Sequence, residues 1–321
     1  DTGEAFDIQP VIGITSTPVI DPTTNTLYCV AKSKENSLYF QRLHALDTAT
    51  GQEKLGGPRL ISASVPGTGD GSVGGLIQFD ALRHLNRPGL LLLNGNLYIG
   101  FGAHSDIRPY HGWVLAYNAA TLQQVAVWNS TPNDEMSGIW QSGQGLAADA
   151  SGYIYFMTAN GAFNANLGGT AYGQSFVKLA TPSLTPFDYF TPNNYVDLNT
   201  GNLDLGTPGP MLLPGTNRLV GGSKEGILYL VDTSNMGHFN AGSDQVLQRF
   251  QVANNTNPNN PIHGCPVYWA TRSGPLLYVW PDTDFLRAFR YSNGLFETTP
   301  AAVGNIGPSG SWNGPHTVMG A

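Results

Sequence analysis

The sequence has few charged residues and only two cysteines. Asp, Glu, Lys and Arg make up 12% of its 321 residues, against about 25% in an average soluble domain. Its 22 acidic residues outnumber its 15 basic ones, for a formal net charge of −7. The basic surface that neutralises nucleic-acid phosphates is therefore missing, and we expect no nucleic-acid partner. Cys29 and Cys265 form neither a disulfide framework nor a CxxC metal signature.

Long apolar runs are also missing. The longest, around Leu90–Leu93, is interrupted by Asn94 and Asn96 and is too short to span a bilayer, so we expect no membrane span. The chain opens at Asp1 without a charged-then-apolar leader. Together with the scarcity of charge and the abundance of Asn, Gly and Thr, this favours a processed or partial form of an exported protein, either secreted, periplasmic or on the cell surface.

The abundant residues indicate a β protein rich in turns. The chain contains 40 glycines and 22 prolines, and 41% of its residues are apolar, enough to build a core. No segment keeps a helical periodicity for three turns. Asn94-Gly95, Ser151-Gly152 and Asn293-Gly294 separate short apolar segments, as hairpin turns do.

A repeat unit of short predicted strands recurs along the chain. Its second element pairs an aliphatic residue with tyrosine or valine, as in Leu27-Tyr28 and Leu97-Tyr98. Its third element approximates the pattern Leu-x-Ala-(aromatic or Leu)-Asp, with repeats spaced by roughly 50 to 70 residues. The five copies of the third element are Leu43–Asp47, Val114–Asn118, Phe176–Ala180, Leu228–Asp232 and Leu286–Arg290.

Four short strands repeated at this spacing are typical of the blade of a β-propeller. We therefore predict an all-β fold, a single propeller domain over residues 1–321 made of four-stranded antiparallel blades. About five complete blades fit between Gly13 and Val303. The tails hold partial blades, including a strand at Trp312–Ala321, so we expect part of a longer seven- or eight-bladed ring. Cys29 and Cys265 lie on distant strands of such a ring and should be two free, buried thiols.

Three segments resemble a known family of propellers. Ala45–Leu55 is similar to the docking repeat Ala-x-Asp-x-x-Thr-Gly-x-x-x-Trp of quinoprotein alcohol dehydrogenases, with Leu55 in place of Trp. Ala148–Gly161 and Gly222–Asp232 resemble further strand pairs of the same family. The chain is most similar to exported bacterial proteins of the PQQ-like (pyrroloquinoline quinone) repeat class, which implies a β-propeller.

The resemblance implies PQQ and calcium as cofactors and assigns three residues to them. Lys224 would polarise a quinone carbonyl, Asn160 would ligate Ca²⁺ through its amide oxygen, and Trp140 lies near the indole on which the quinone stacks. The family's catalytic aspartate maps onto Gly169, which carries no base, and no carboxylate is evident to complete a calcium site. The implied catalytic set is therefore incomplete.

A second candidate cluster lies on one predicted loop. His104, Asp106, Tyr110 and His111 form the densest group of polar side chains in the sequence. Two histidines with an aspartate can bind a transition metal or act as acid and base, although their spacing matches no zinc pattern. Hydrogen bonding within the loop is the alternative interpretation.

These observations favour a binding or assembly module that recognises a protein or a carbohydrate through its loops. Three inserts, Ser62–Arg87, Asn193–Pro208 and Val252–Ile262, are long, polar and rich in glycine or asparagine, as recognition loops often are. Two alternatives remain open. One is a PQQ- and calcium-dependent oxidoreductase acting on alcohols or sugars. The other is a polysaccharide-active enzyme using His104, Tyr110 and His111.

Overall fold

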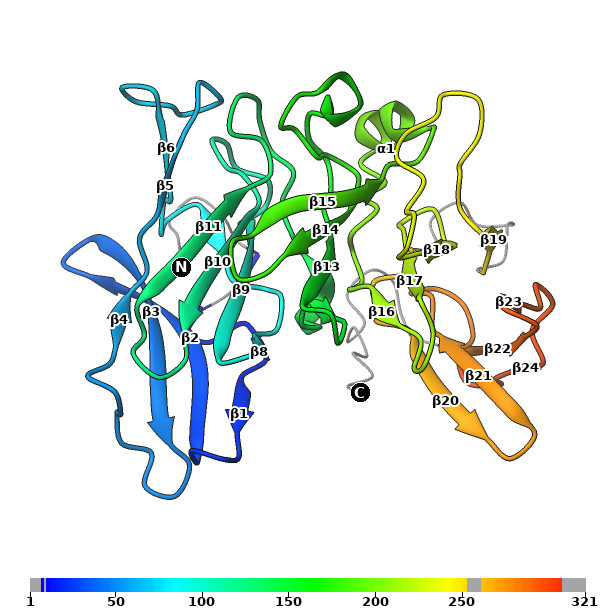
Figure 1. The fold of residues 1–321 in the computed structure, drawn as a ribbon, viewed down its shortest axis with the longest axis horizontal. Helices are drawn as coiled ribbons and strands as arrows, with labels where there is room; N and C mark the ends of the chain where they lie inside the picture. The colour runs from blue at the N-terminus through cyan, green and yellow to red at the C-terminus, as the bar shows by residue number, and fades with distance from the viewer. Residues whose placement is uncertain (1–6, 9, 253–260, 308–321) are drawn as a thin grey trace.

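A computed structural model describes residues 7, 8, 10–252 and 261–307. Within these ranges the chain forms five antiparallel blades that follow one another around an arc (Figure 1). Blade 1 comprises β1 (Val19–Asp21), β2 (Thr26–Glu35), β3 (Leu38–Asp47) and β4 (Arg59–Leu60); blade 2 comprises β8 (Leu91–Leu93), β9 (Asn96–Ala103), β10 (Trp113–Asn118) and β11 (Gln124–Asn129), with β7 (His84–Leu85) also paired to β9.

The remaining three blades repeat the same meander. They are blade 3 with β12 (Ala147–Ala148), β13 (Tyr153–Met157), β14 (Phe176–Ala180) and β15 (Thr185–Phe190); blade 4 with β16 (Met211–Leu212), β17 (Arg218–Gly222), β18 (Ile227–Asp232) and β19 (Gln248–Gln251); and blade 5 with β20 (Val267–Thr271), β21 (Gly274–Val279), β22 (Arg287–Ser292), β23 (Leu295–Phe296) and β24 (Ala302–Val303). The predicted all-β propeller of four-stranded blades is confirmed. The strand expected at Trp312–Ala321 lies outside the described residues.

The recurring Asp or Asn at the end of the third strand forms an Asx turn. Asp47 Oδ1 accepts the backbone N–H of Thr50 at 2.9 Å. Asn118 Oδ1 accepts that of Thr121 at 3.0 Å, and Asp232 Oδ1 accepts that of Ser234 at 2.9 Å. Short polar side chains capture backbone donors in this way and reverse the chain. In blades 1, 2 and 4 the repeat signal in the sequence is therefore the signal of the turn that ends the third strand.

The core lies between blades. Successive residues of a strand point to opposite faces, so neighbouring positions enter different cores. In β9, Leu97 and Ile99 pack in the cluster between blades 1 and 2, whereas Tyr98 packs between blades 2 and 3. In β18, Leu228 packs toward blade 5 and Tyr229 toward blade 3. The middle strands are apolar at nearly every position because both of their faces are covered.

The two cysteines are free and buried, as predicted. Cys29 lies in β2, and Cys265 lies just before β20. Burial raises the pKa of the Cys265 thiol to about 11, which keeps it protonated at neutral pH. Among the described residues, no helix is both long and apolar enough to cross a membrane.

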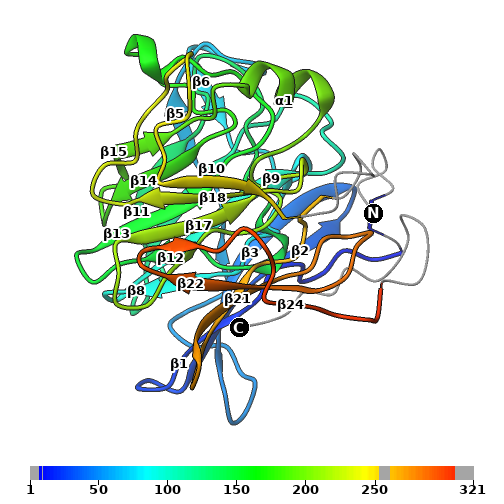
Figure 2. The ribbon, with the colours of Figure 1, turned by 90° about the vertical axis from the view of Figure 1, so that its right-hand side faces the viewer.

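Long connections gather at one edge of the arc, which we call the loop edge. It consists of the β5–β6 hairpin (β5, Ser64–Pro66; β6, Leu76–Gln78), residues 132–136 and 162–172, and the insert that carries α1 (Tyr195–Gly201). Figures 1 and 2 show the hairpin and α1 projecting on the same side of the blades. Two of the three predicted recognition inserts therefore contain short elements of their own, while most of the third, Val252–Ile262, lies outside the described residues.

Candidate functional site

A cavity of about 200 Å³ lies where connections from blades 2 to 5 meet, and we call it the central cavity. Trp140 and Lys224, two of the three residues nominated by the resemblance, both line it. Its other ionisable lining residues are Asp7, Arg87, Asp106, Asp204 and His263. The sequence therefore located part of this site, and the structure adds ionic groups that no motif indicated.

Lys224 forms an ion pair with Asp204. It follows β17, its Nζ contacts the Asp204 carboxylate, and its backbone N–H donates to the Asp204 carbonyl oxygen at 3.0 Å. Burial raises the pKa of the Asp204 carboxyl, although the positive charge of Lys224 opposes that shift. The cation expected to polarise a quinone is therefore bound to a carboxylate of its own chain.

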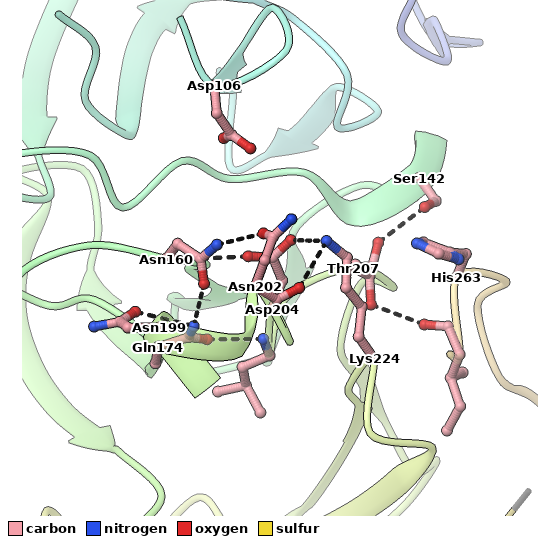
Figure 3. Close-up of polar contacts among 12 residues, drawn as sticks. Asp106, Ser142, Asn160, Gln174, Asn199, Asn202, Asp204, Thr207, Lys224 and His263 are labelled. Atoms are coloured by element: carbon pink, nitrogen blue, oxygen red, sulfur yellow. Dashed lines mark hydrogen bonds and ion pairs between the residues drawn. The ribbon is translucent and has the colours of Figure 1, made fainter. Parts of the chain in front are cut away.

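Asn160 lies beside this ion pair in a closed network of side-chain amides (Figure 3). Its backbone N–H donates to Asp204 Oδ1 at 3.3 Å, and its Nδ2 donates to Asn202 Oδ1 at 2.5 Å. Its Oδ1 accepts from Gln174 Nε2 at 2.6 Å. Gln174 is itself fixed, because its Oε1 accepts the Leu205 N–H at 2.8 Å. Both ends of the Asn160 amide are thus satisfied within the protein.

A carboxylate does lie beside these residues, although none was evident from the sequence. Gly169 indeed carries no base, and a Cβ there would overlap the Asn164 side chain, which packs directly against it. The carboxylate beside Asn160 and Lys224 comes instead from Asp204, in the insert that follows α1. No repeat pattern covers that insert. Its length and the scarcity of charge in this sequence were the signals that could have drawn attention to it.

The site does not match the needs of PQQ and calcium. Pockets for organic ligands of drug size usually measure about 300–1,000 Å³, and this cavity is smaller, at about 200 Å³. Calcium takes about six to eight oxygen ligands, yet the Asn160 Oδ1 and the Asp204 carboxylate are engaged by Gln174 and Lys224. In the described part of the chain, no three His, Cys, Asp or Glu side chains are grouped to hold a metal ion. We therefore derive no chemical step through either cofactor.

The predicted cluster of His104, Asp106, Tyr110 and His111 separates into different surroundings. Asp106 lines the central cavity and accepts the Tyr110 hydroxyl at 2.7 Å. Burial, and to a lesser degree the Asp106 charge, raises the pKa of Tyr110, which therefore stays protonated. His104 Nδ1 lies 3.0 Å from a carboxylate oxygen of Asp7.

His111 points elsewhere. Its ring nitrogens contact the Thr131 hydroxyl and the Asp70 carbonyl oxygen, each at 2.9 Å. It lines a separate cavity of about 490 Å³ beside the β5–β6 hairpin. Burial lowers the pKa of His111. The four side chains therefore form no common site, and Asp106 alone among them reaches the central cavity.

Three non-glycine residues in the connections around the central cavity have a strained backbone. Ser105, Asp106 and Ser142 have φ values of 49°, 55° and 44°, in the left-handed region that non-glycine residues avoid. Such conformations cost about 1–3 kcal/mol each and persist where the surroundings impose them. Ser142 is held in this way by its hydroxyl, which donates to the Thr207 carbonyl oxygen at 2.9 Å. The cavity wall is therefore built by the fold rather than by local preference.

Comparisons with known proteins find relatives in structure but not in sequence. No protein-family model matches the chain, and no curated protein matches it in sequence. Similar solved structures include quinohemoprotein alcohol dehydrogenase from Comamonas testosteroni (16% identity, TM-score 0.46, 89% of this chain and 54% of that chain). BamB from Moraxella catarrhalis is another (12% identity, TM-score 0.47, 89% of this chain and 60% of that chain).

The propeller of Dos1 is similar with a TM-score of 0.51, at 10% identity over 94% of this chain and 62% of that chain. The present chain thus spans between about half and two thirds of each of these structures. At such identities the likeness is one of fold. The likeness to the Dos1 propeller agrees with the β-propeller seen in the blades.

Proposed function

We propose that this protein is an exported binding module, secreted, periplasmic or at the cell surface, which recognises a protein partner with its loop edge. The observation that supports the proposal is that three projecting loops along this edge each expose an aliphatic side chain. Val73, Leu167 and Val196 are 74%, 83% and 56% exposed. They come from the β5–β6 hairpin, the 162–172 loop and α1. Apolar side chains that several loops expose along one edge are candidates for an interaction site.

The kind of side chain favours a protein over a carbohydrate. Sugars bind chiefly by stacking on aromatic rings, whereas Val73, Leu167 and Val196 offer branched aliphatic surface. Two aromatic rings of the loop edge pack against each other instead of facing a ligand, since the ring centroids of Phe163 and Tyr195 lie 5.1 Å apart. A carbohydrate partner remains the second outcome that the experiments below distinguish.

Contacts between the loops hold this surface in place. The Asp70 N–H of the hairpin donates to the Asp134 carbonyl oxygen at 2.8 Å. Asn164 Nδ2 donates to an Asp134 carboxylate oxygen at 2.9 Å, and Phe163 packs on Tyr195 of α1. Consecutive loops are therefore linked from the hairpin to α1. Because these loops are already ordered in the free protein, they lose less conformational entropy when a partner binds.

The central cavity argues against the alternative, a PQQ- and calcium-dependent oxidoreductase. Lys224 and Asp204 pair with each other, and both ends of the Asn160 amide are already hydrogen-bonded. A quinone or calcium ion would first have to displace these contacts. The pair would separate only if the incoming group compensated both charges, because an uncompensated buried charge destabilises the fold.

Site-specific photo-crosslinking tests the proposed surface. A photoreactive residue is placed at Leu167 or Val196 in the full chain, expressed in the organism that makes it. The matched control is Ile20, which is 53% exposed on β1, on the side away from the hairpin and α1. We expect one predominant protein adduct from both loop positions and none from Ile20, and Leu167→Asp should suppress the adduct formed at position 196. Equal adducts at Ile20, or no effect of Leu167→Asp, would contradict the proposal.

Reconstitution tests the alternative function. The purified protein is mixed with PQQ and Ca²⁺, its absorption spectrum is recorded, and dye reduction is followed with alcohols and sugars. We expect no stoichiometric quinone spectrum and no turnover. Bound quinone together with dye reduction that disappears in Lys224→Ala would establish the oxidoreductase instead. Retention on a carbohydrate array that Leu167→Asp abolishes would assign the loop edge to a sugar.

A further inference from the structure

Arg87 is the first unusual feature of the central cavity. It lies in the connection between β7 and β8, and its guanidinium makes one described hydrogen bond, a long 3.4 Å contact from Nη2 to the Ser142 hydroxyl. The nearby carboxylates are engaged elsewhere, Asp7 with His104 and Asp204 with Lys224. Among the described residues, no carboxylate lies within ion-pair distance of Arg87.

An arginine in this position needs a counter-ion. Burial lowers the pKa of Arg87, yet a guanidinium stays charged in proteins. A partly buried charge without a partner destabilises the fold unless another group compensates for it. The geometry of the cavity would let a bound anion supply that compensation, because the guanidinium forms part of the wall.

Asp106 provides the opposite charge at another part of the wall. One of its oxygens accepts the Tyr110 hydroxyl, and no described group donates to the other. In Figure 3 Asp106 lies apart from Asp204 and Lys224, with no dashed contact to either. Asp106 is exposed and so lies at the mouth of the cavity, whereas Arg87 is half-buried. The two form no ion pair with each other.

The remaining wall is partly apolar. Trp140 and Leu85 line the cavity together with the ionic groups. A volume of about 200 Å³ holds a ligand smaller than a drug-sized molecule, for which pockets start at about 300 Å³. The cavity thus offers a cation, an anion and an apolar surface within a small space.

We propose that the central cavity binds a small zwitterion with an apolar side chain, a free amino acid, whose carboxylate pairs with Arg87 and whose ammonium group faces Asp106. The side chain would pack on Trp140 and Leu85. This site is separate from the loop edge, so it goes beyond the proposed function and can fail or succeed independently of it.

Calorimetric titration of the full chain with L-leucine and L-phenylalanine tests the proposal. N-acetyl-leucine, which lacks the ammonium group, and leucine methyl ester, which lacks the carboxylate, are the matched controls. We expect one free amino acid per chain. Binding should be roughly tenfold weaker or more for the methyl ester, which loses its charge-assisted contact with Arg87. It should be only a few-fold weaker for N-acetyl-leucine, whose partner Asp106 is exposed. Absence of binding by both free amino acids, or equal binding of either blocked form, would overturn the proposal.

Arg87→Met separates a binding role from a structural one. The variant keeps most of the apolar stem and removes the uncompensated charge. We expect amino-acid binding to weaken by roughly 10- to 100-fold, while the melting temperature of the ligand-free protein stays the same or rises. Arg290→Met on β22, outside the cavity, is the control and should bind as the unaltered chain does. A lower melting temperature with unchanged binding would show that Arg87 is structural and would refute the site.

Asp106→Asn should weaken binding only a few-fold, because the carboxylate is exposed and its charge is screened by water. An effect larger than that of Arg87→Met would contradict the assigned orientation of the ligand. The crosslinking experiment at Leu167 reports on a different surface, so its result and this one are independent.

Discussion

The junction between blades 3 and 4 and the outer face of blade 5 are built from the same kind of strand but have opposite surroundings. At the junction, Phe176, Phe190 and Tyr229 are completely buried and their rings contact one another. On blade 5, Trp269 of β20 is 65% exposed, although its cross-strand neighbour is the apolar Leu276. An apolar residue in a blade therefore stabilises the fold only where another blade covers it.

Truncating an aromatic ring in each region should give the largest contrast. Phe176→Ala is expected to lower the free energy of unfolding by about 3–5 kcal/mol, because it leaves a cavity between blades. Trp269→Ala should change it by less than about 0.5 kcal/mol, as exposed substitutions do. Both values are measured by denaturant titration. Similar losses in the two variants would mean that the outer face of blade 5 is covered in solution.

Adding a methyl group should distinguish the same two regions. A Cβ at Gly221 of β17 would overlap the Met157 and Phe176 side chains at the junction, so Gly221→Ala is expected to destabilise by about 1–3 kcal/mol. Gly304 follows β24, where the nearest atoms would lie 3.5 Å from a new Cβ. Gly304→Ala should therefore be nearly neutral in the same titration. A neutral Gly221→Ala would show that the junction can relax.

Acid should weaken the junction between blades 1 and 2 through His84. Its Nε2 accepts the Trp113 indole N–H at 2.9 Å, and burial lowers its pKa to about 3 from 6.5. Between these two pH values the unfolded chain binds a proton and the folded chain does not. The contribution of neutral His84 to the free energy of unfolding is therefore fully present above pH 6.5. Below that pH the free energy of unfolding falls by about 1.4 kcal/mol per pH unit, down to about pH 3.

The measurement is the free energy of unfolding at pH 7 and pH 5. His84→Gln keeps a hydrogen-bond acceptor without titrating, so its pH dependence should be shallower than that of the unaltered chain. Identical slopes in the two proteins would exclude His84 as the source.

The blades could be predicted from the sequence because their signals repeat. The Asx residues Asp47, Asn118 and Asp232 recur at the ends of third strands, and strands covered on both faces are apolar throughout. Such periodic signals reinforce one another along the chain. The resemblance to quinoprotein propellers added Trp140 and Lys224, which do share one cavity.

The rest of the site escaped prediction because single residues supply it from irregular connections. Asp204 and Arg87 lie in inserts without repeat or motif, and tertiary contacts alone bring them to the cavity. His104 and His111 show the converse. They are close in sequence, but the loop between them turns their side chains toward different partners, Asp7 and Asp70.

In blades 1, 2 and 4 an Asx turn follows the third strand on the edge opposite the long loops, and one side chain fixes each of these turns. Strand pairing is thereby set from one end. The other end is free to lengthen, as the hairpin and α1 show, without shifting the register of any strand. Insertions at the loop edge can therefore change the contact surface during evolution while the blades stay the same. For the same reason, the loop edge is the place to graft new binding segments.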